Sequence, residues 1–282
     1  MKPAPLIYKR ADDIASAQDM VAKAQGFAKL IAGGQTLGPM INLRLTQPDV
    51  LIDVSRIPAL RRIEERGGVL HIGAGVRHAE IEDGRVPDVT GGLMRRAART
   101  LAYRAVRNRG TIGGSLAHAD PVAEWPTVLS ALGASVLIAG RTAKRETSLD
   151  RFFVGYLTTI LEPDDVLEAV LVPKLPAGSR VGYHKFCRKH GEFAQSLAAV
   201  VAGSPGSGPG GSRVVLGSAG STPLVLASVA AIVAERRWRD GIESEIRRAV
   251  AADLAALGKT LDAYDAHLHS TIVVRAVKEA IA

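Results

Sequence analysis

The sequence predicts an α+β protein made of two globular units. Its 282 residues exceed the length of a typical single domain, so two units that share an interface are the first expectation. Pro173, Pro176 and Gly178 interrupt any regular pattern, which favours a boundary near residues 174–182. After this boundary strands precede a run of helices, an order typical of α+β folds.

The first segment is expected to contain a helix and two strands. Asp12 can cap the helix with its carboxylate. The apolar residues that follow it repeat at helical spacing, at Ile14, Ala17, Met20, Val21 and Ala24. A short apolar strand at 29–32 runs directly into Gly33 and Gly34, and a second strand is expected at 50–54.

A tight hairpin is expected next. Gly67 and Gly68 separate the region of Ile63 from an apolar strand at 69–72, and a Gly-Gly pair is a common two-residue connection between twisted antiparallel strands. The rest of the first unit should contain an arginine-rich helix at 93–101, a helix that carries Trp125, and strands at 136–139 and 166–172.

The second unit is expected to be a small antiparallel sheet packed with a three-helix unit. Residues 204–211, rich in glycine, serine and proline, read as a hairpin loop. The expected strands and helices are strands at 195–202 and 213–218, and helices at 224–234, 242–257 and 271–281.

Composition excludes several classes of protein. Hydrophobic residues make up 47% and charged residues 23%, which is typical of folded globular chains. The net charge of +8 is spread along the chain without interleaved aromatic residues, which argues against binding of nucleic acid. No apolar run approaches the roughly 20 residues of a membrane span and the first residues lack an apolar signal segment, so a cytoplasmic location is expected.

The chain has one cysteine, Cys187. A single thiolate cannot hold an iron–sulfur cluster or a zinc site with several thiolates, and the histidines show no metal-ligand spacing. No metal site is therefore expected in this chain. Cys187 itself is expected to be a small side chain within a strand.

Two glycine pairs carry the chemistry that the sequence suggests. They are Gly33-Gly34, followed by Thr36, and Gly113-Gly114, followed by Ser115. Neither matches the Rossmann or P-loop pattern. In a turn, a missing Cβ lets backbone N–H groups approach an anion, and the hydroxyl group adds a donor. One such turn is more often a plain connection, but two in one unit favour a site for a pyrophosphate.

The residues around both pairs match a known family. Residues 32–37 read Ala-Gly-Gly-Gln-Thr-Leu, and residues 107–121 read Arg-Asn-Arg-Gly-Thr-Ile-Gly-Gly-Ser-Leu-Ala-His-Ala-Asp-Pro. Further matches continue to Phe193 and Ala194, so they cover nearly the whole chain. In these stretches the chain resembles the FAD-binding medium subunit of molybdenum hydroxylases, the xanthine dehydrogenase and carbon monoxide dehydrogenase group.

The resemblance implies both a fold and a role. The fold would be a FAD-binding domain of the vanillyl-alcohol-oxidase (PCMH) type at 1–176, with subdomains of about 1–57 and 58–176, and a C-terminal domain at 177–282. The chain would pass electrons from a small iron–sulfur subunit with [2Fe-2S] clusters through FAD to an external acceptor. A large partner subunit would hold the molybdenum cofactor, in a dimer of heterotrimers.

The resemblance also implies a set of FAD-binding residues: Ala32, Gly33, Gly34, Gln35, Thr36, Leu37, Thr111, Ile112, Gly113, Gly114, Ser115, Asp120, Glu124, Leu161 and Lys185. The two glycine segments would bind the pyrophosphate, with Ile112 near the flavin. Asp120 and Glu124 are candidates for hydroxyl groups of the ribose or the flavin tail. Leu161 and Lys185 would approach the isoalloxazine, where an ammonium group can stabilise negative charge on reduced flavin. Alternatively, Glu124 faces solvent and Lys185 is an exposed residue of an edge strand.

Departures from the family pattern refine the expectation. Gln35 and Thr36 stand where some flavoproteins of this fold attach FAD through a histidine, so FAD is expected to bind non-covalently. Certain family members carry a cluster-binding insertion, which one cysteine excludes. His118 could move a proton, but electron transfer from flavin needs no dedicated base, so a structural hydrogen bond is expected.

Two other functions remain open at this point. The chain could be a self-sufficient flavin oxidase or reductase, which would need its own acid or base over the flavin; no convincing pair is evident. It could also be a scaffold protein without cofactor, although both glycine pairs and their hydroxyl residues are intact. The organic substrate and the electron acceptor, whether NAD, a quinone, a cytochrome or oxygen, cannot be read from this chain.

Overall fold

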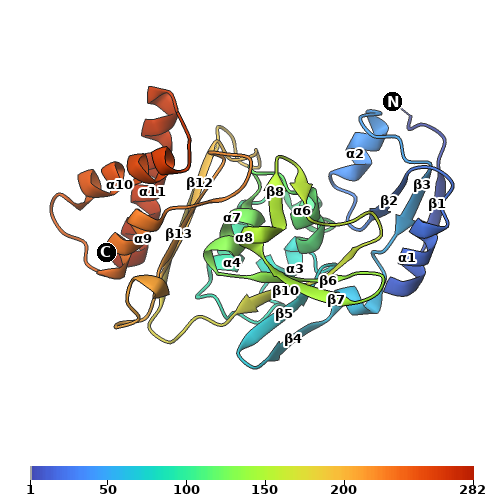
Figure 1. Cartoon of the computed structure of the whole chain (residues 1–282), viewed down its shortest axis with the longest axis horizontal. Helices are drawn as coiled ribbons and strands as arrows, with labels where there is room; N and C mark the ends of the chain where they lie inside the picture. The colour runs from blue at the N-terminus through green and yellow to red at the C-terminus, as the bar shows by residue number, and fades with distance from the viewer. Residues whose placement is uncertain (1) are drawn as a thin grey trace.

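The computed structural model describes residues 2–282 and places three main sheets in a row (Figure 1). The first is a parallel sheet of β1 (Ile7–Arg10), β3 (Val50–Asp53) and β2 (Ala28–Ile31), in that spatial order. The middle sheet is antiparallel, in the order β4 (Ile63–Arg66), β5 (Val69–Gly73), β10 (Val166–Pro173), β6 (Ser135–Ala139) and β7 (Lys144–Ser148). The third, also antiparallel, is formed by β11 (Arg180–Phe186), β12 (Ser196–Ala202), β13 (Arg213–Gly217) and β14 (Leu224–Val225).

Helices cover these sheets and fill the space between them (Figure 1). Those of the first half of the chain are α1 (Ile14–Ala22), α2 (Leu37–Asn42), α3 (His78–Glu82), α4 (Leu93–Thr100), α5 (Arg104–Arg107), α6 (Ile112–His118), α7 (Glu124–Ala131) and α8 (Leu149–Phe152). The last three are α9 (Ala227–Ala234), α10 (Ile242–Ala256) and α11 (Ala263–Ile281). Two 3₁₀ turns (Pro58–Arg61 and Pro209–Gly211) and the small hairpin of β8 (Phe153–Gly155) and β9 (Thr158–Thr159) complete the fold.

The first helix begins one residue later than expected. Asp13, not Asp12, is the N-cap of α1, because its carboxylate accepts the N–H of Ser16 and the Ser16 hydroxyl oxygen accepts the N–H of Asp13. This reciprocal pair is a capping box. Strand β1 was missed, because all four of its residues are exposed and show no alternation; it forms only by parallel pairing with β3.

The predicted Gly-Gly hairpin is confirmed. Gly67 and Gly68 join β4 to β5, and both have positive φ, +57° and +78°, as this connection requires. The strands predicted at 136–139 and 166–172 are present as β6 and β10, and they pair with each other in the middle sheet. Strand β7 was not predicted, because it consists of polar residues on the edge of that sheet.

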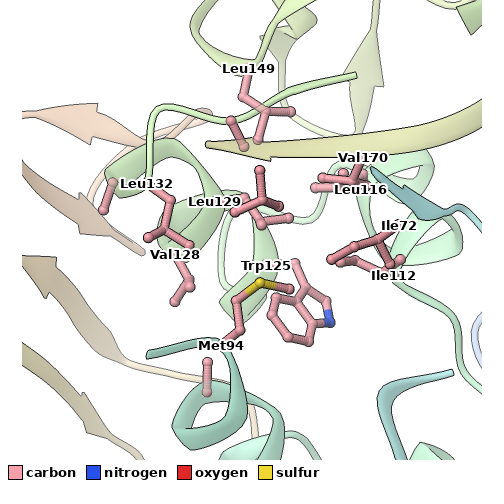
Figure 2. Close-up of a cluster of buried hydrophobic side chains, with 14 of the residues drawn as sticks. Ile72, Met94, Ile112, Leu116, Trp125, Val128, Leu129, Leu132, Leu149 and Val170 are labelled. Atoms are coloured by element: carbon pink, nitrogen blue, oxygen red, sulfur yellow. The ribbon is translucent and has the colours of Figure 1, made fainter. Parts of the chain in front are cut away.

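Trp125 lies at the centre of the main hydrophobic core. The predicted helices α4 and α7 are both present, and every residue of α7 is buried. Trp125 is completely buried, and Met94 of α4 and Ile112 of α6 lie around it (Figure 2). The segment that contains the second glycine pair is therefore anchored in the core of the first unit.

The third sheet separates two hydrophobic cores. Along β12, Leu197, Ala199 and Val201 belong to the core around Trp125, whereas Ala198, Val200 and Ala202 face the core formed with α9, α10 and α11. All seven residues of β12 are buried, which is typical of a strand covered on both faces. The main core thus runs on from the first unit into one face of the third sheet.

The C-terminal helices were predicted with two errors in their bounds. Leu224 and Val225 form β14, and α9 starts only after them. Helix α11 begins at Ala263 rather than Thr271, because Asp262 caps it by accepting the N–H of Asp265, and its first turns are too exposed to show an apolar pattern. Cys187 lies just after β11, not within a strand, and is half-buried. Among the described helices, none is both long and apolar enough to cross a bilayer.

Candidate functional site

The first glycine segment, residues 32–36, connects the end of β2 to the start of α2. Gly34 has a φ of +67°, which glycine adopts without strain. The backbone N–H groups of residues 33–36 donate no hydrogen bond within residues 2–282, although residues 33–35 are half-buried. Backbone N–H groups that are partly buried nearly always have a hydrogen-bond acceptor in folded proteins. The four N–H groups of residues 33–36 are an exception, so they are available to donate to a ligand.

The two glycine-rich segments lie directly against each other. A Cβ atom at residue 33 would overlap the carbonyl oxygen of Arg109 and lie 2.8 Å from the Cα of Gly110. Only glycine permits this approach without movement of the backbone. The structure therefore brings the first segment against the residues that lead into the second one, as a shared pyrophosphate site requires.

The second glycine pair is not a turn. Gly113 and Gly114 form the first turn of α6, whose N-cap is Thr111; the Thr111 hydroxyl accepts the N–H of Gly114 at 3.0 Å. The N–H groups of Ile112 and Gly113 donate to the carbonyls of Val76 and Ala74. The expectation that these N–H groups are free for an anion is therefore wrong, because those of Ile112 and Gly113 are occupied by the segment at 74–76 and those of Gly114 and Ser115 donate to Thr111.

What the second segment offers is an open surface and a hydroxyl group. Gly114 is exposed and Ser115 is half-buried, and the Ser115 hydroxyl forms no hydrogen bond within residues 2–282. The side chain of Ile112 is completely buried in the core, so it does not face this surface. Gly113 serves packing, because a Cβ atom there would lie 2.8 Å from the Cα of Ala74.

A buried histidine supports the second segment. His78 donates its backbone N–H to the carbonyl of Gly110, and its ring fills the space where a Gly110 side chain would lie. The indole N–H of Trp125 donates to Nδ1 of His78 at 3.0 Å. Burial, together with the charge of Arg107, lowers the pKa of His78 to about 3, so this histidine is neutral. Sequence reasoning missed this role, since no spacing connects residues 78, 110 and 125.

Arg107, the first residue of the matched motif, is structural. It is 7% exposed, and its guanidinium donates to both carboxylate oxygens of Glu82, at 2.7 and 3.0 Å. It also donates to the carbonyls of Leu101 and Ala102, and Ala102 has a φ of +36°. The hydrogen bonds from Arg107 lower the pKa of Glu82 against the effect of burial, so the carboxylate stays charged.

Asp120 and His118 lie just beyond the second segment. Asp120 is half-buried, and its carboxylate accepts the N–H of Val122 at 3.1 Å. His118 is the last residue of α6; burial lowers its pKa although the charge of Asp120 acts in the opposite direction. Both side chains remain partly accessible at the end of the helix whose start carries Gly114.

Glu124 and Lys185 bind each other in the interior. The Lys185 ammonium lies 2.6 Å from Oε1 of Glu124, and the two side chains are 4% and 3% exposed. Lys185 also donates to the carbonyls of Thr100 and Glu192. Burial raises the pKa of Glu124, and the charge of Lys185 opposes this shift. Both alternatives, a solvent-facing Glu124 and an exposed Lys185, are wrong, although β11 is an edge strand.

Leu161 lies beside the main core rather than on the open surface. It is half-buried and packs against that core, and its N–H donates to the hydroxyl of Thr159 in β9. The structure thus joins the two glycine segments in one place and pairs Glu124 with Lys185 in another. No group of three metal-binding side chains occurs within residues 2–282.

Comparison with known proteins shows the family of this chain. Residues 4–175 match the family model described as the FAD binding domain in molybdopterin dehydrogenase. The 6-hydroxypseudooxynicotine dehydrogenase complex subunit alpha of Paenarthrobacter nicotinovorans is 38% identical over 71% of this chain and 68% of its own length. The carbon monoxide dehydrogenase medium chain of Hydrogenophaga pseudoflava is 34% identical over 79% of this chain and 78% of its own.

A solved structure extends the similarity to the whole chain. Carbon monoxide dehydrogenase from Hydrogenophaga pseudoflava superposes with a TM-score of 0.90 and 32% identity, over 99% of this chain and 98% of the matched one. The resemblance inferred from residues 32–37 and 107–121 is thus confirmed. The chain belongs to the family of FAD-binding components of molybdopterin dehydrogenases, and it is a component of an oxidoreductase.

Proposed function

We propose that this chain binds the diphosphate of FAD non-covalently between its two glycine segments and transfers electrons through the flavin. The observation that carries the proposal is the packing of Gly33 against Arg109 and Gly110, beside a row of unused N–H donors at residues 33–36. A diphosphate has enough oxygen atoms to accept from these donors and from the Ser115 hydroxyl together. The open surface over Gly114 leaves room for it.

The other residues of the two segments fit this cofactor. Thr36 is exposed with no hydrogen bond from its side chain in the cap of α2, so its hydroxyl can donate to an oxygen at the same place. Ala32, Gln35 and Leu37 would line the first segment, and Thr111 would hold the second by capping α6. Asp120, half-buried near the end of α6, is the candidate for a sugar or tail hydroxyl.

The proposed mechanism assigns positioning and electrostatic roles to this chain. FAD, when bound, supplies the one- and two-electron chemistry. The backbone donors of residues 33–36 hold the diphosphate, while the pairs His78–Trp125 and Glu82–Arg107 keep the second segment in place. Lys185, which Glu124 holds in place at 2.6 Å, and Leu161 are proposed to lie toward the isoalloxazine, as the family resemblance implies. No residue of this chain is assigned as an acid or base.

The partners are proposed from the relatives. The matched chains include a medium chain of carbon monoxide dehydrogenase and a subunit of a dehydrogenase complex. We propose that this chain likewise works with a large molybdenum-cofactor subunit and a small subunit with [2Fe-2S] clusters, as a dimer of heterotrimers in the cytoplasm. Residues 1–176 would be a FAD domain of the PCMH type with subdomains of about 1–57 and 58–176, and residues 177–282 the C-terminal domain.

One experiment tests this function directly. The purified chain is incubated with FAD, passed through a desalting column and scanned for the flavin absorbance band at about 450 nm. A band that corresponds to one FAD per chain, and that is released as free FAD on denaturation, is expected. A chain that carries no flavin after this treatment would refute the proposal, and flavin that stays attached after denaturation would refute non-covalent binding.

A further inference from the structure

A cavity of about 270 Å³ lies between α10 and α11. These two helices are at the opposite end of the molecule from the first sheet (Figure 1). The lining residues come from 247–254 of α10 and from 266–270 of α11. None of them belongs to the glycine segments or to the Glu124–Lys185 pair, so the proposed binding of FAD leaves this cavity without a role.

Most of the cavity wall is apolar. Val250 and Leu254, which are 1% and 5% exposed, form its floor. Ala251 and Ala266 are exposed and small, so they leave the cavity open to solvent. Covering such a floor with hydrocarbon removes apolar surface from water on both sides, which favours binding. The cavity therefore suits the apolar part of a small ligand.

One arginine is fixed at this wall. Arg247 is half-buried, and its Nη1 donates to the hydroxyls of Ser270 at 2.9 Å and Thr271 at 3.0 Å. The Ser270 hydroxyl in turn donates to the carbonyl of His267, so its oxygen is free to accept from Arg247. These bonds hold the guanidinium against α11, beside the cavity that Ser270 also lines.

Arg247 lacks a carboxylate partner. Within residues 2–282 it forms no ion pair, and its Nε and Nη2 donate no hydrogen bond. By contrast Arg239, just before α10, is paired with both Glu235 and Glu245. No acidic side chain of the described residues lines the cavity. The planar edge formed by Nε and Nη2 matches the two oxygens of a carboxylate, and in Arg247 this edge is unused.

We propose that this cavity binds a small amphipathic carboxylate. Its carboxylate accepts hydrogen bonds from Nε and Nη2 of Arg247, and its hydrocarbon chain lies on Val250 and Leu254. Small molecules bind in concave sites of roughly 300–1,000 Å³, and this cavity is just below that range, so a chain of a few carbon atoms fits. The site does not depend on the proposed function, because it shares no residue with the FAD site.

Hexanoate is the probe, and hexan-1-ol is the matched ligand with the same hydrocarbon chain and no charge. Dissociation constants for the full-length chain, with and without FAD, are measured by ligand-observed NMR titration. We expect hexanoate to bind with a dissociation constant of about 1 mM or below, and hexanol to bind at least about tenfold more weakly. FAD should change neither value.

Three variants locate the site. Arg247→Met removes the cation and should weaken hexanoate binding at least about tenfold, while hexanol binding stays unchanged. Ala251→Phe fills the opening from an exposed position and should weaken binding of both ligands. Arg248→Met is the control, because Arg248 is the next residue of α10, is exposed and does not line the cavity. Urea unfolding checks that each variant is folded.

Several outcomes would overturn the proposal. They are no binding of hexanoate by the wild type, equal binding of hexanoate and hexanol, and equal binding of hexanoate by the wild type and Arg247→Met. Displacement of hexanoate by FAD would do so as well, because the site would then belong to the cofactor. Ala251→Phe leaves the bonds from Arg247 to α11 in place, so unchanged hexanoate binding in this variant would also refute the cavity as the site, even if Arg247→Met fails to fold.

Discussion

Gly33 lies against the backbone of Arg109, so closely that a Cβ atom at residue 33 would overlap the Arg109 carbonyl oxygen. This contact joins the connection after β2, in the first sheet, to the segment that enters α6, beside the middle sheet. The relative position of the two glycine segments therefore depends on the absence of one methyl group.

Replacing Gly33 with alanine should weaken FAD binding. The added Cβ must push residue 33 away from Arg109 and Gly110, which separates the donors of residues 33–36 from Ser115. We expect the dissociation constant of FAD to rise at least about tenfold, measured by quenching of flavin fluorescence. Gly38→Ala is the control, because no heavy atom lies within 4 Å of a Cβ there. Equal affinities in the two variants would contradict the proposed packing role.

Replacing Arg107 with methionine should destabilise the chain strongly. The substitution leaves the Glu82 carboxylate without its main partner and frees the carbonyls of Leu101 and Ala102. Breaking a buried ion pair typically costs about 3 kcal/mol or more of folding free energy. The free energy of unfolding in urea measures this, with the exposed Arg188→Met as control. A loss below about 0.5 kcal/mol would show that the pair contributes little.

Glu124 and Lys185 should show strong coupling. Each of Glu124→Leu and Lys185→Met leaves one buried charge unpaired, and we expect losses of about 3 kcal/mol or more in the free energy of unfolding. The double variant leaves no unpaired charge and should be more stable than the sum of the single losses predicts, by more than about 1 kcal/mol. The free energies of unfolding in urea of the wild type, the two single variants and the double variant together give the coupling energy between Glu124 and Lys185. Simple additivity would mean that the two charges do not interact as the structure indicates.

Stability should fall in weak acid because of His78. Its pKa is lowered from 6.5 to about 3 in the folded chain, so only the unfolded chain binds this proton between those values. The contribution of neutral His78 to the free energy of unfolding is fully present above pH 6.5. This contribution declines as the pH falls towards 3, by up to about 1.4 kcal/mol per pH unit. Unfolding measured from pH 7 to 4 should therefore be steeper in the wild type than in His78→Gln. Parallel profiles would rule out a buried neutral His78.

Much of the fold was predictable because its signals are local. The Gly-Gly hairpin and helices α4, α7 and α10 follow from turn chemistry and periodicity within short windows. Strand β1 and the first turns of α11 were missed, since exposed polar residues carry no such pattern. The continuity of the main core into β12 was also missed, because it depends on contacts between distant parts of the chain.

The candidate site was predictable only in part. The glycine motifs identified both segments, but not that Gly113 and Gly114 begin a helix whose first N–H groups, those of residues 112–115, already have acceptors within the chain. Glu124 and Lys185 were singled out separately, and nothing in the sequence indicates that they bind each other across 61 residues. The supporting roles of His78 and Glu82 arise from tertiary packing, which a sequence pattern does not contain.

The central claim is that this chain binds FAD through its diphosphate, and a comparison of flavins tests it most directly. FAD contains the diphosphate, FMN has one phosphate and riboflavin has none, while all three share the same ring. Titration of the flavin-free chain by isothermal calorimetry should give a dissociation constant for FAD at least about 100-fold below those for FMN and riboflavin, which corresponds to about 2.8 kcal/mol. Equal affinities for the three flavins, or no binding of FAD, would contradict the account.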